Sequence, residues 1–172
     1  QAPRGIAWTP DNKFVYVISF DSGEIIKLAR PDFTVVNRIA TGGANDRIRI
    51  DRAGRYCYID NMVFGCVYVY EIATDRIVRT IPVGTNPNNV RLSHDESRLY
   101  VACRGPNNPA SYLLRSPANG EIMVFDIRDN FRLLHRFEAG NQAVGLDLSK
   151  DGRHLVFSNL QDSTIKLYRI NM

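Results

Sequence analysis

The chain has 172 residues, of which 44% are hydrophobic and 23% are charged, as in one ordinary globular domain. Its 12 Gly and 8 Pro exclude a fibre and a disordered tail, and no apolar run approaches the roughly 20 residues of a membrane-spanning helix. The net charge is +4, and 18 of the 22 basic residues are Arg, but they are scattered, so the sequence has no basic arm.

Short runs rich in Val, Ile, Tyr and Phe recur along the chain, and turn residues separate them. The first copy holds four runs, at 5–9, 14–19, 24–28 and 34–42. The first two runs recur after 42 residues, after 42 more and after a further 56, at 47–51, 54–61, 89–93, 98–103, 145–149 and 154–159. The other two recur at 66–70, 76–84, 121–125, 133–140 and 164–168. Such runs indicate β-strands, and no window of ten residues has a helical period.

Four strands in a unit of about 40 residues is the period of a β-propeller blade. We therefore predict a single all-β propeller domain with four units of antiparallel strands, at approximately 5–46, 47–88, 89–144 and 145–172. The last unit lacks its outer strand, which makes fifteen strands and leaves an exposed edge. We expect the chain to be the C-terminal part of a roughly seven-bladed propeller that pairs with the missing N-terminal blades or with a second copy. A self-contained ring of four blades is the alternative.

The repeats resemble those of a known family. The segments Tyr16–Ser19, Tyr58–Asn61, Tyr100–Cys103 and Val156–Asn159 resemble the Tyr-Val-Thr-Asn signature of YVTN-repeat β-propellers. Ile81–Val90 is similar to the connector of that family, Ile-x-Val-Gly-x-x-Pro-x-x-Val. An insertion in the third unit departs from the pattern. The resemblance implies a periplasmic or cell-surface location, but it specifies no single activity.

The insertion lies in the loop 104–119, which joins the second and third strands of the third unit and contains three prolines. Loops of this length in a compact repeat are usually functional or disordered. Because the apolar centre 112–114 lies between two arginines, the loop suits a protein partner or an anionic ligand. The alternative is a loop that folds over its own blade. The candidate partner-binding residues of the loop are Arg104, Asn107, Asn108, Tyr112, Leu113 and Arg115.

The same face of a propeller collects the other loops of this type, which are the usual binding surface. They carry an amide-rich rim suited to a polar ligand, formed by Asn45, Asn61, Asn86, Asn88, Asn141 and Gln142. The alternative is that Asn and Gly occur there because tight loops need positive φ angles.

Three charged residues take equivalent positions on the predicted innermost strands: Arg49, Arg91 and Asp147. The two arginines are candidates to hold an anion in the central channel. The structural alternative is that Asp147 neutralises an Arg of a neighbouring blade.

The sequence predicts no catalytic residue, metal site or cofactor, because its three His are scattered and no pair of Cys has the spacing of a redox or zinc motif. Cys57 and Cys103 lie in apolar strands, which favours free thiols over disulfides. The function that we expect is a non-enzymatic scaffold that holds a protein or an anionic polymer on its loop face. The alternatives are an oxidoreductase subunit that binds haem or quinone, and a protein that binds single-stranded nucleic acid through Arg and Tyr.

Overall fold

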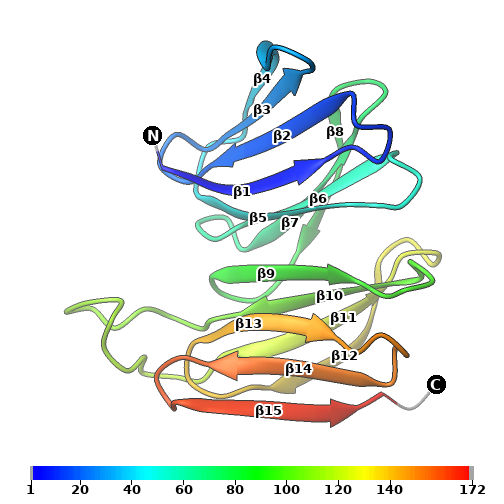
Figure 1. Cartoon of the computed structure of the whole chain (residues 1–172). Helices are drawn as coiled ribbons and strands as arrows, with labels where there is room; N and C mark the ends of the chain where they lie inside the picture. Colours follow the sequence, from blue (N-terminus) through cyan, green and yellow to red (C-terminus); the bar gives the residue numbers. More distant parts are fainter. Residues whose placement is uncertain (1, 171–172) are drawn as a thin grey trace. The chain divides into compact units, whose positions relative to one another are not determined.

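A computed structural model describes residues 2–170, and these residues form fifteen β-strands in four antiparallel sheets and no helix (Figure 1). No part of this range therefore provides a helix that could span a membrane. The chain divides into two compact units, one ending at Pro82 and the other beginning at Val83. All contacts given below lie within one unit.

The first unit contains two four-stranded sheets, and in each the strands follow one another in chain order. The first sheet consists of β1 (Pro3–Trp8), β2 (Phe14–Ser19), β3 (Glu24–Ala29) and β4 (Thr34–Ala40). The second consists of β5 (Asn45–Ile50), β6 (Tyr56–Asn61), β7 (Cys66–Glu71) and β8 (Arg76–Pro82). The sheets pack together through β1, β2 and β5. The core between them includes Tyr16 and Tyr70, whose ring centroids lie 5.6 Å apart in an edge-on contact.

The second unit has the same design with one strand fewer. Its first sheet consists of β9 (Pro87–Leu92), β10 (Arg98–Cys103), β11 (Glu121–Asp126) and β12 (Arg132–Glu138), and its second of β13 (Ala143–Leu148), β14 (His154–Asn159) and β15 (Thr164–Arg169). The strand β13 packs against β9 and β10. Leu146, Leu155 and Phe157 are buried in the core of this unit. The predicted fold class, a partial β-propeller with a three-stranded last sheet, is confirmed.

Burial decreases from the middle of a sheet to its outer strand. Five of the six residues of β7 are buried, whereas β12 has no fully buried residue. The middle strands have a sheet neighbour on both sides and packed side chains on both faces, which explains their continuous apolar sequences. Within residues 2–170, β15 is paired with β14 alone, and its Ile165 and Leu167 are 75% and 68% exposed. The association of this edge with another chain stays a prediction.

A bulge near the start of two innermost strands is capped by a side chain of the neighbouring strand. In the β5–β6 pair the register shifts between Asn45 and Ile48, and Asp60 Oδ1 accepts the backbone N–H groups of Asp46 (3.1 Å) and Arg47 (2.7 Å). In the β13–β14 pair, Ser158 Oγ accepts the N–H of Gly145 at 3.0 Å. These side chains accept hydrogen bonds from backbone N–H groups that the bulge prevents from pairing with the neighbouring strand.

Candidate functional site

The predicted amide rim is mostly inside the protein. Five of its six side chains are buried and one is partly buried; the buried ones are Asn45, Asn61, Asn88, Asn141 and Gln142. A buried amide must be hydrogen-bonded, and these amides therefore brace loops instead of facing a ligand. The expectation of an exposed rim is corrected on this point. The alternative, a positive φ angle in a tight loop, describes two of the six residues, Asn86 and Gln142.

Asn61 shows how such an amide works. Its Nδ2 donates to the carbonyl of Gly42 at 2.9 Å and to Asn45 Oδ1 at 3.0 Å, while its Oδ1 accepts the N–H of Phe64 at 3.1 Å. Gly43 has a φ of 63°, and a Cβ on it would meet Asn61 Oδ1 at 2.3 Å. The loop before β5 therefore requires both the amide and the glycine. The partly buried Asn86 acts similarly, because its Nδ2 donates to the carbonyl of Gly105 at 2.9 Å.

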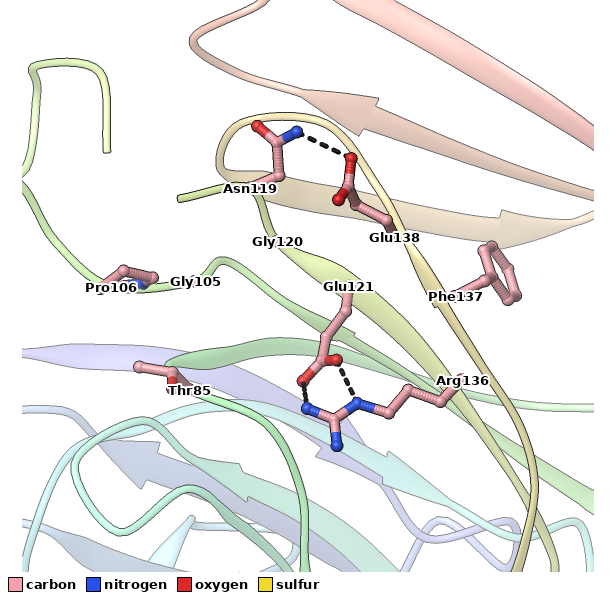
Figure 2. A pocket seen from close by; sticks show the side chains of 9 residues that line it. All are labelled: Thr85, Gly105, Pro106, Asn119, Gly120, Glu121, Arg136, Phe137 and Glu138. Atoms are coloured by element: carbon pink, nitrogen blue, oxygen red, sulfur yellow. Dashed lines mark hydrogen bonds and ion pairs between the residues drawn. The ribbon is translucent and has the colours of Figure 1, made fainter. Parts of the chain in front are cut away.

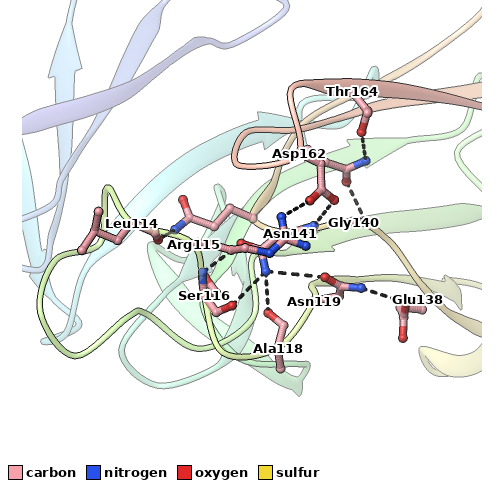
Figure 3. Close-up of polar contacts among 12 residues, drawn as sticks. Leu114, Arg115, Ser116, Ala118, Asn119, Glu138, Gly140, Asn141, Asp162 and Thr164 are labelled. Carbon is pink, nitrogen blue, oxygen red and sulfur yellow. Dashed lines mark hydrogen bonds and ion pairs between the residues drawn. The ribbon is translucent and has the colours of Figure 1, made fainter.

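Asn141 fastens the end of the long loop (Figure 3). Its Oδ1 accepts the N–H of Ser116 at 2.9 Å, and its Nδ2 donates back to the Ser116 carbonyl at 3.0 Å and to that of Ala118 at 3.3 Å. The N–H of Asn141 donates to Asp162 Oδ2 at 2.7 Å, and Arg115 pairs with the other oxygen of Asp162. The hydrogen bond from Asn141, together with Arg115, lowers the pKa of Asp162.

Gln142 fastens the middle of the same loop. This buried residue has a φ of 56°, in the left-handed region that is strained for a side chain other than glycine. Its Nε2 donates to the carbonyls of Tyr112 (2.8 Å) and Leu114 (3.0 Å), and its Oε1 accepts Arg104 Nη2 at 2.6 Å. Arg104, predicted to face a partner, is itself buried. The loop thus has fixed anchor points.

The remaining loop residues are more accessible. Asn107 is exposed, and Asn108 folds inward to the loop, because its Nδ2 donates to the carbonyl of Arg115 at 2.8 Å. Tyr112 and Leu113 are more than half exposed. Of the residues proposed for partner contact, those two, Asn107 and Arg115 are exposed, although Arg115 also forms an ion pair with Asp162.

A pocket of about 380 Å³ lies beside the loop, between its two ends and the strands β11 and β12 (Figure 2). Glu121 forms a two-fold ion pair with Arg136, and Asn119 Nδ2 donates to Glu138 Oε1 at 3.0 Å. Sequence reasoning missed this group. A signal for this acidic group was present in the sequence, because Glu121 and Glu138 lie at facing ends of two neighbouring predicted strands. The structure pairs these two residues in the sheet.

The innermost strands carry the predicted channel residues at one common register. Arg49, Arg91 and Asp147 stand opposite Tyr58, Tyr100 and Val156 of the next strand in each sheet. Arg91 Nε donates to Asp147 Oδ1 at 3.0 Å, as the structural alternative requires. The same Oδ1 accepts the N–H of Leu148 at 2.9 Å. Arg49 makes no ion pair within residues 2–170, and its Nη1 donates to the carbonyl of Ile48 at 2.7 Å.

The pair of Arg91 and Asp147 is accessible and only partly satisfied. The side chain of Asp147 is 65% exposed and that of Arg91 is 26% exposed. Both hydrogen bonds to the Asp147 carboxylate use Oδ1, and no described residue donates to Oδ2. The carboxylate is therefore held in place by one oxygen and open to water at the other.

The other reactive residues in the described part of the chain are not grouped. Cys57, Cys66 and Cys103 are free and buried, and burial raises the pKa of Cys57 and Cys66. His94 Nε2 lies 2.8 Å from the carbonyl oxygen of Ser149. Within residues 2–170, no three His, Cys, Asp or Glu side chains are placed to hold a metal ion together.

Residues 76–172 match the model of the family described as Lactonase, 7-bladed beta-propeller. The matched stretch is more than half of the chain, and the chain therefore belongs to this family. Over 175 residues it is 31% identical to Antigen Lp49 of Leptospira interrogans, an alignment that covers 97% of this chain and 38% of that protein.

Among solved structures, the chain is similar to candidate 6-phosphogluconolactonases from Bacteroides uniformis (TM-score 0.80, 15% identity) and Bacteroides fragilis (TM-score 0.80, 14% identity). It is also similar to Kuenenia stuttgartiensis hydrazine synthase, with a TM-score of 0.78 and 18% identity. These alignments cover 98% of this chain and 49–51% of the others, so the chain spans about half the length of those proteins. At such low identity they show the fold alone.

The family match corrects the expected function. A non-enzymatic scaffold was predicted because no catalytic constellation was visible in the sequence, whereas the matching family is one of lactonases, which are hydrolytic enzymes. The repeat pattern correctly indicated a β-propeller, but the family model that matches is not that of the YVTN repeats.

Proposed function

We propose that this chain is part of a hydrolase that opens a lactone, the cyclic ester of a hydroxy acid. The observation that carries the proposal is the match of residues 76–172 to the lactonase propeller family. The matched stretch contains Arg91 and Asp147, the exposed charged pair of the innermost strands.

The pair has the groups that lactone hydrolysis needs. Water must lose a proton as its oxygen attacks the carbonyl carbon, and negative charge then develops on the carbonyl oxygen. No residue in the described range donates to Asp147 Oδ2, which is therefore available to accept that proton. Arg91 donates to Asp147 through Nε, and within residues 2–170 its Nη groups make no hydrogen bond. The Nη groups are therefore available to donate to the carbonyl oxygen of the lactone or to an anionic group of the substrate.

In the proposed reaction, Asp147 accepts a proton from water while the water oxygen bonds to the carbonyl carbon. The ring C–O bond then breaks, and the proton passes to the departing ring oxygen, which becomes the hydroxyl of the product. The other product group is a carboxylate, and its acid proton is released to solvent. No oxidant, reductant or co-reactant besides water is required.

The names of the two Bacteroides relatives suggest the lactone of a phosphorylated sugar acid as the substrate class. An excess of arginine in this chain, 18 residues against 4 lysines, is consistent with binding such an anion, since guanidinium groups bind phosphate in a two-pronged geometry.

The test is a pH-stat measurement of acid release from 6-phosphogluconolactone, with the spontaneous rate subtracted. It is done with this chain and with a longer protein that contains it, because the chain spans about half of its structural relatives. We expect Asp147→Asn to lower kcat/KM by about 10²-fold or more, as for loss of a general base. Arg91→Gln should also lower kcat/KM, because it removes a guanidinium that faces the developing negative charge, and gluconolactone should be the poorer substrate.

The matched controls are Asp129→Asn and Arg132→Gln, which alter an exposed Asp–Arg pair in the same unit. Both should keep the parent activity. Full activity of the Asp147→Asn enzyme would refute the role of that carboxylate, and the absence of acid release above the spontaneous rate in both proteins would refute the function.

The YVTN resemblance additionally supports a periplasmic or cell-surface location, which we propose for the protein that contains this chain. Fractionation of cells that express the natural protein checks it, and recovery in the cytoplasmic fraction would contradict it.

A further inference from the structure

A second pocket of the carboxy-terminal unit differs in character from the one in Figure 2. It has a volume of about 300 Å³, at the lower end of the range for small-molecule sites, roughly 300–1,000 Å³. It lies between the two sheets of the unit, and residues of β10, β11, β12, β14 and β15 line it. It shares no residue with the Arg91–Asp147 pair.

The wall of this pocket is largely aromatic and aliphatic. Phe137 and Tyr168 both line it, with ring centroids 5.0 Å apart. The other apolar or aromatic lining residues are Tyr100, Val124, Leu155 and Ile170. Phe157 lies behind Tyr168, and the two rings are stacked at 5.4 Å. The aromatic side chains are thus held against one another and offer a preformed surface to a flat apolar group.

The rim of the pocket is positively charged. Arg98 and Arg169 line it, and within residues 2–170 neither guanidinium has an ion-pair partner or a side-chain hydrogen bond. A third arginine, Arg136, also lines it but is neutralised by Glu121. No Asp or Glu is among the lining residues.

Acids occur in the adjoining hollow of about 230 Å³, which shares Arg98 with the pocket. Its Asp95 accepts hydrogen bonds from Ser93 and Ser97, and its Asp151 accepts one from Ser149. Neither carboxylate forms an ion pair with Arg98. The two unpaired guanidinium groups therefore leave a local excess of positive charge beside an apolar wall.

We propose that this pocket binds a small organic carboxylate with an aromatic body. The ring would lie against Phe137 and Tyr168, and the carboxylate would accept hydrogen bonds from Arg98 and Arg169. Charge-assisted hydrogen bonds of this kind are the strong ones, and the apolar wall supplies the area that an aromatic ring buries. This binding site is separate from the proposed hydrolytic function and does not depend on it.

The probe is 3-phenylpropanoate, which we expect to bind with a Kd of about 1 mM or lower, measured by calorimetry and by NMR shifts of residues around the pocket. The alcohol 3-phenylpropan-1-ol and the amine 3-phenylpropan-1-amine have the same body without the negative charge. We expect the alcohol to bind at least about tenfold more weakly and the amine not to bind, because only the carboxylate pairs with the guanidinium groups.

The double variant Arg98→Gln/Arg169→Gln removes both guanidinium groups and should raise the Kd of 3-phenylpropanoate by about tenfold or more. The control is Arg128→Gln/Arg132→Gln, which removes two exposed arginines of the same unit that pair with Asp95 and Asp129. It should leave binding unchanged. The comparison of the three probes on the parent chain remains decisive even where a variant fails to fold.

Equal binding of the alcohol and the carboxylate, or no saturable binding of the carboxylate, would overturn the proposal. The same measurement on a longer protein of the family's usual length supplies a third criterion. Retained binding there supports a ligand site, whereas loss of binding shows that the protein's own chain fills the pocket and refutes it.

Discussion

Asp60 offers the sharpest test of how the first unit is stabilised. Its carboxyl group is completely buried, Oδ1 caps the two N–H groups of the β5 bulge, and within residues 2–170 nothing hydrogen-bonds to Oδ2. Burial raises the pKa of Asp60 well above its ordinary value, and the nearby carboxylate of Asp46 acts in the same direction. We therefore expect Asp60 to be protonated in the folded protein at pH values where an ordinary Asp is ionised.

Asp60→Ala should lower the free energy of unfolding by about 2–4 kcal/mol, because it leaves one buried and one partly buried N–H without an acceptor. This loss is a large part of the roughly 5–15 kcal/mol that stabilises a typical domain. Asp60→Ser should cost less, because the serine at the equivalent position, Ser158, caps the corresponding bulge of the second unit through its hydroxyl. Asp60→Asn keeps the accepting oxygen and cannot ionise, so it should lie within about 1 kcal/mol of the parent at about pH 4 and below, where the parent carboxyl is protonated in both states.

The pH dependence follows from linkage. Below the unfolded pKa of about 4, both states are protonated and Asp60 causes no loss of stability. Above it the unfolded state releases the proton and the folded state keeps it, so the parent protein loses up to about 1.4 kcal/mol per pH unit until the folded pKa is reached. The Asp60→Asn protein lacks this term, and its stability relative to the parent should therefore rise with pH.

Urea unfolding of the four proteins from pH 4 to pH 8, followed by circular dichroism, measures these differences. The parent and Asp60→Asn proteins share all other titrating groups, so their difference isolates Asp60. A difference that does not change with pH would show that the carboxyl is ionised in the folded state. An Asp60→Ala protein as stable as the parent would refute the capping argument.

Two further predictions concern the long loop and the thiols. Gln142→Ala removes the hydrogen bonds to the carbonyls of Tyr112 and Leu114, so limited proteolysis should cut this loop faster while the thermal midpoint falls only modestly; cleavage at the parent rate would contradict the anchoring role. The three cysteines are buried, and burial raises the pKa of Cys57, so Ellman's reagent should titrate none of them in the native protein and all three in denaturant; prompt reaction of any native thiol would contradict this burial.

The sequence by itself determined the architecture. Each blade repeats the same run of strands and turns, so the hydrophobic spacing predicted fifteen strands, three of them in the last sheet. The described residues form these fifteen strands in that arrangement. The common position of Arg49, Arg91 and Asp147 was also readable, since equivalent positions in a repeat take the same register in the sheet.

Only the tertiary structure decided which polar side chains are available. Asn141 and Gln142 resemble exposed loop residues in the sequence, but long-range contacts bury them under the loop 104–119, where they satisfy its backbone. The pairing of Asp147 through one oxygen, and the positive rim formed by Arg98 and Arg169, likewise depend on strands that are distant in the chain. Local sequence encodes strands and turns because these depend on near neighbours, whereas burial and charge pairing depend on which repeats come to face one another.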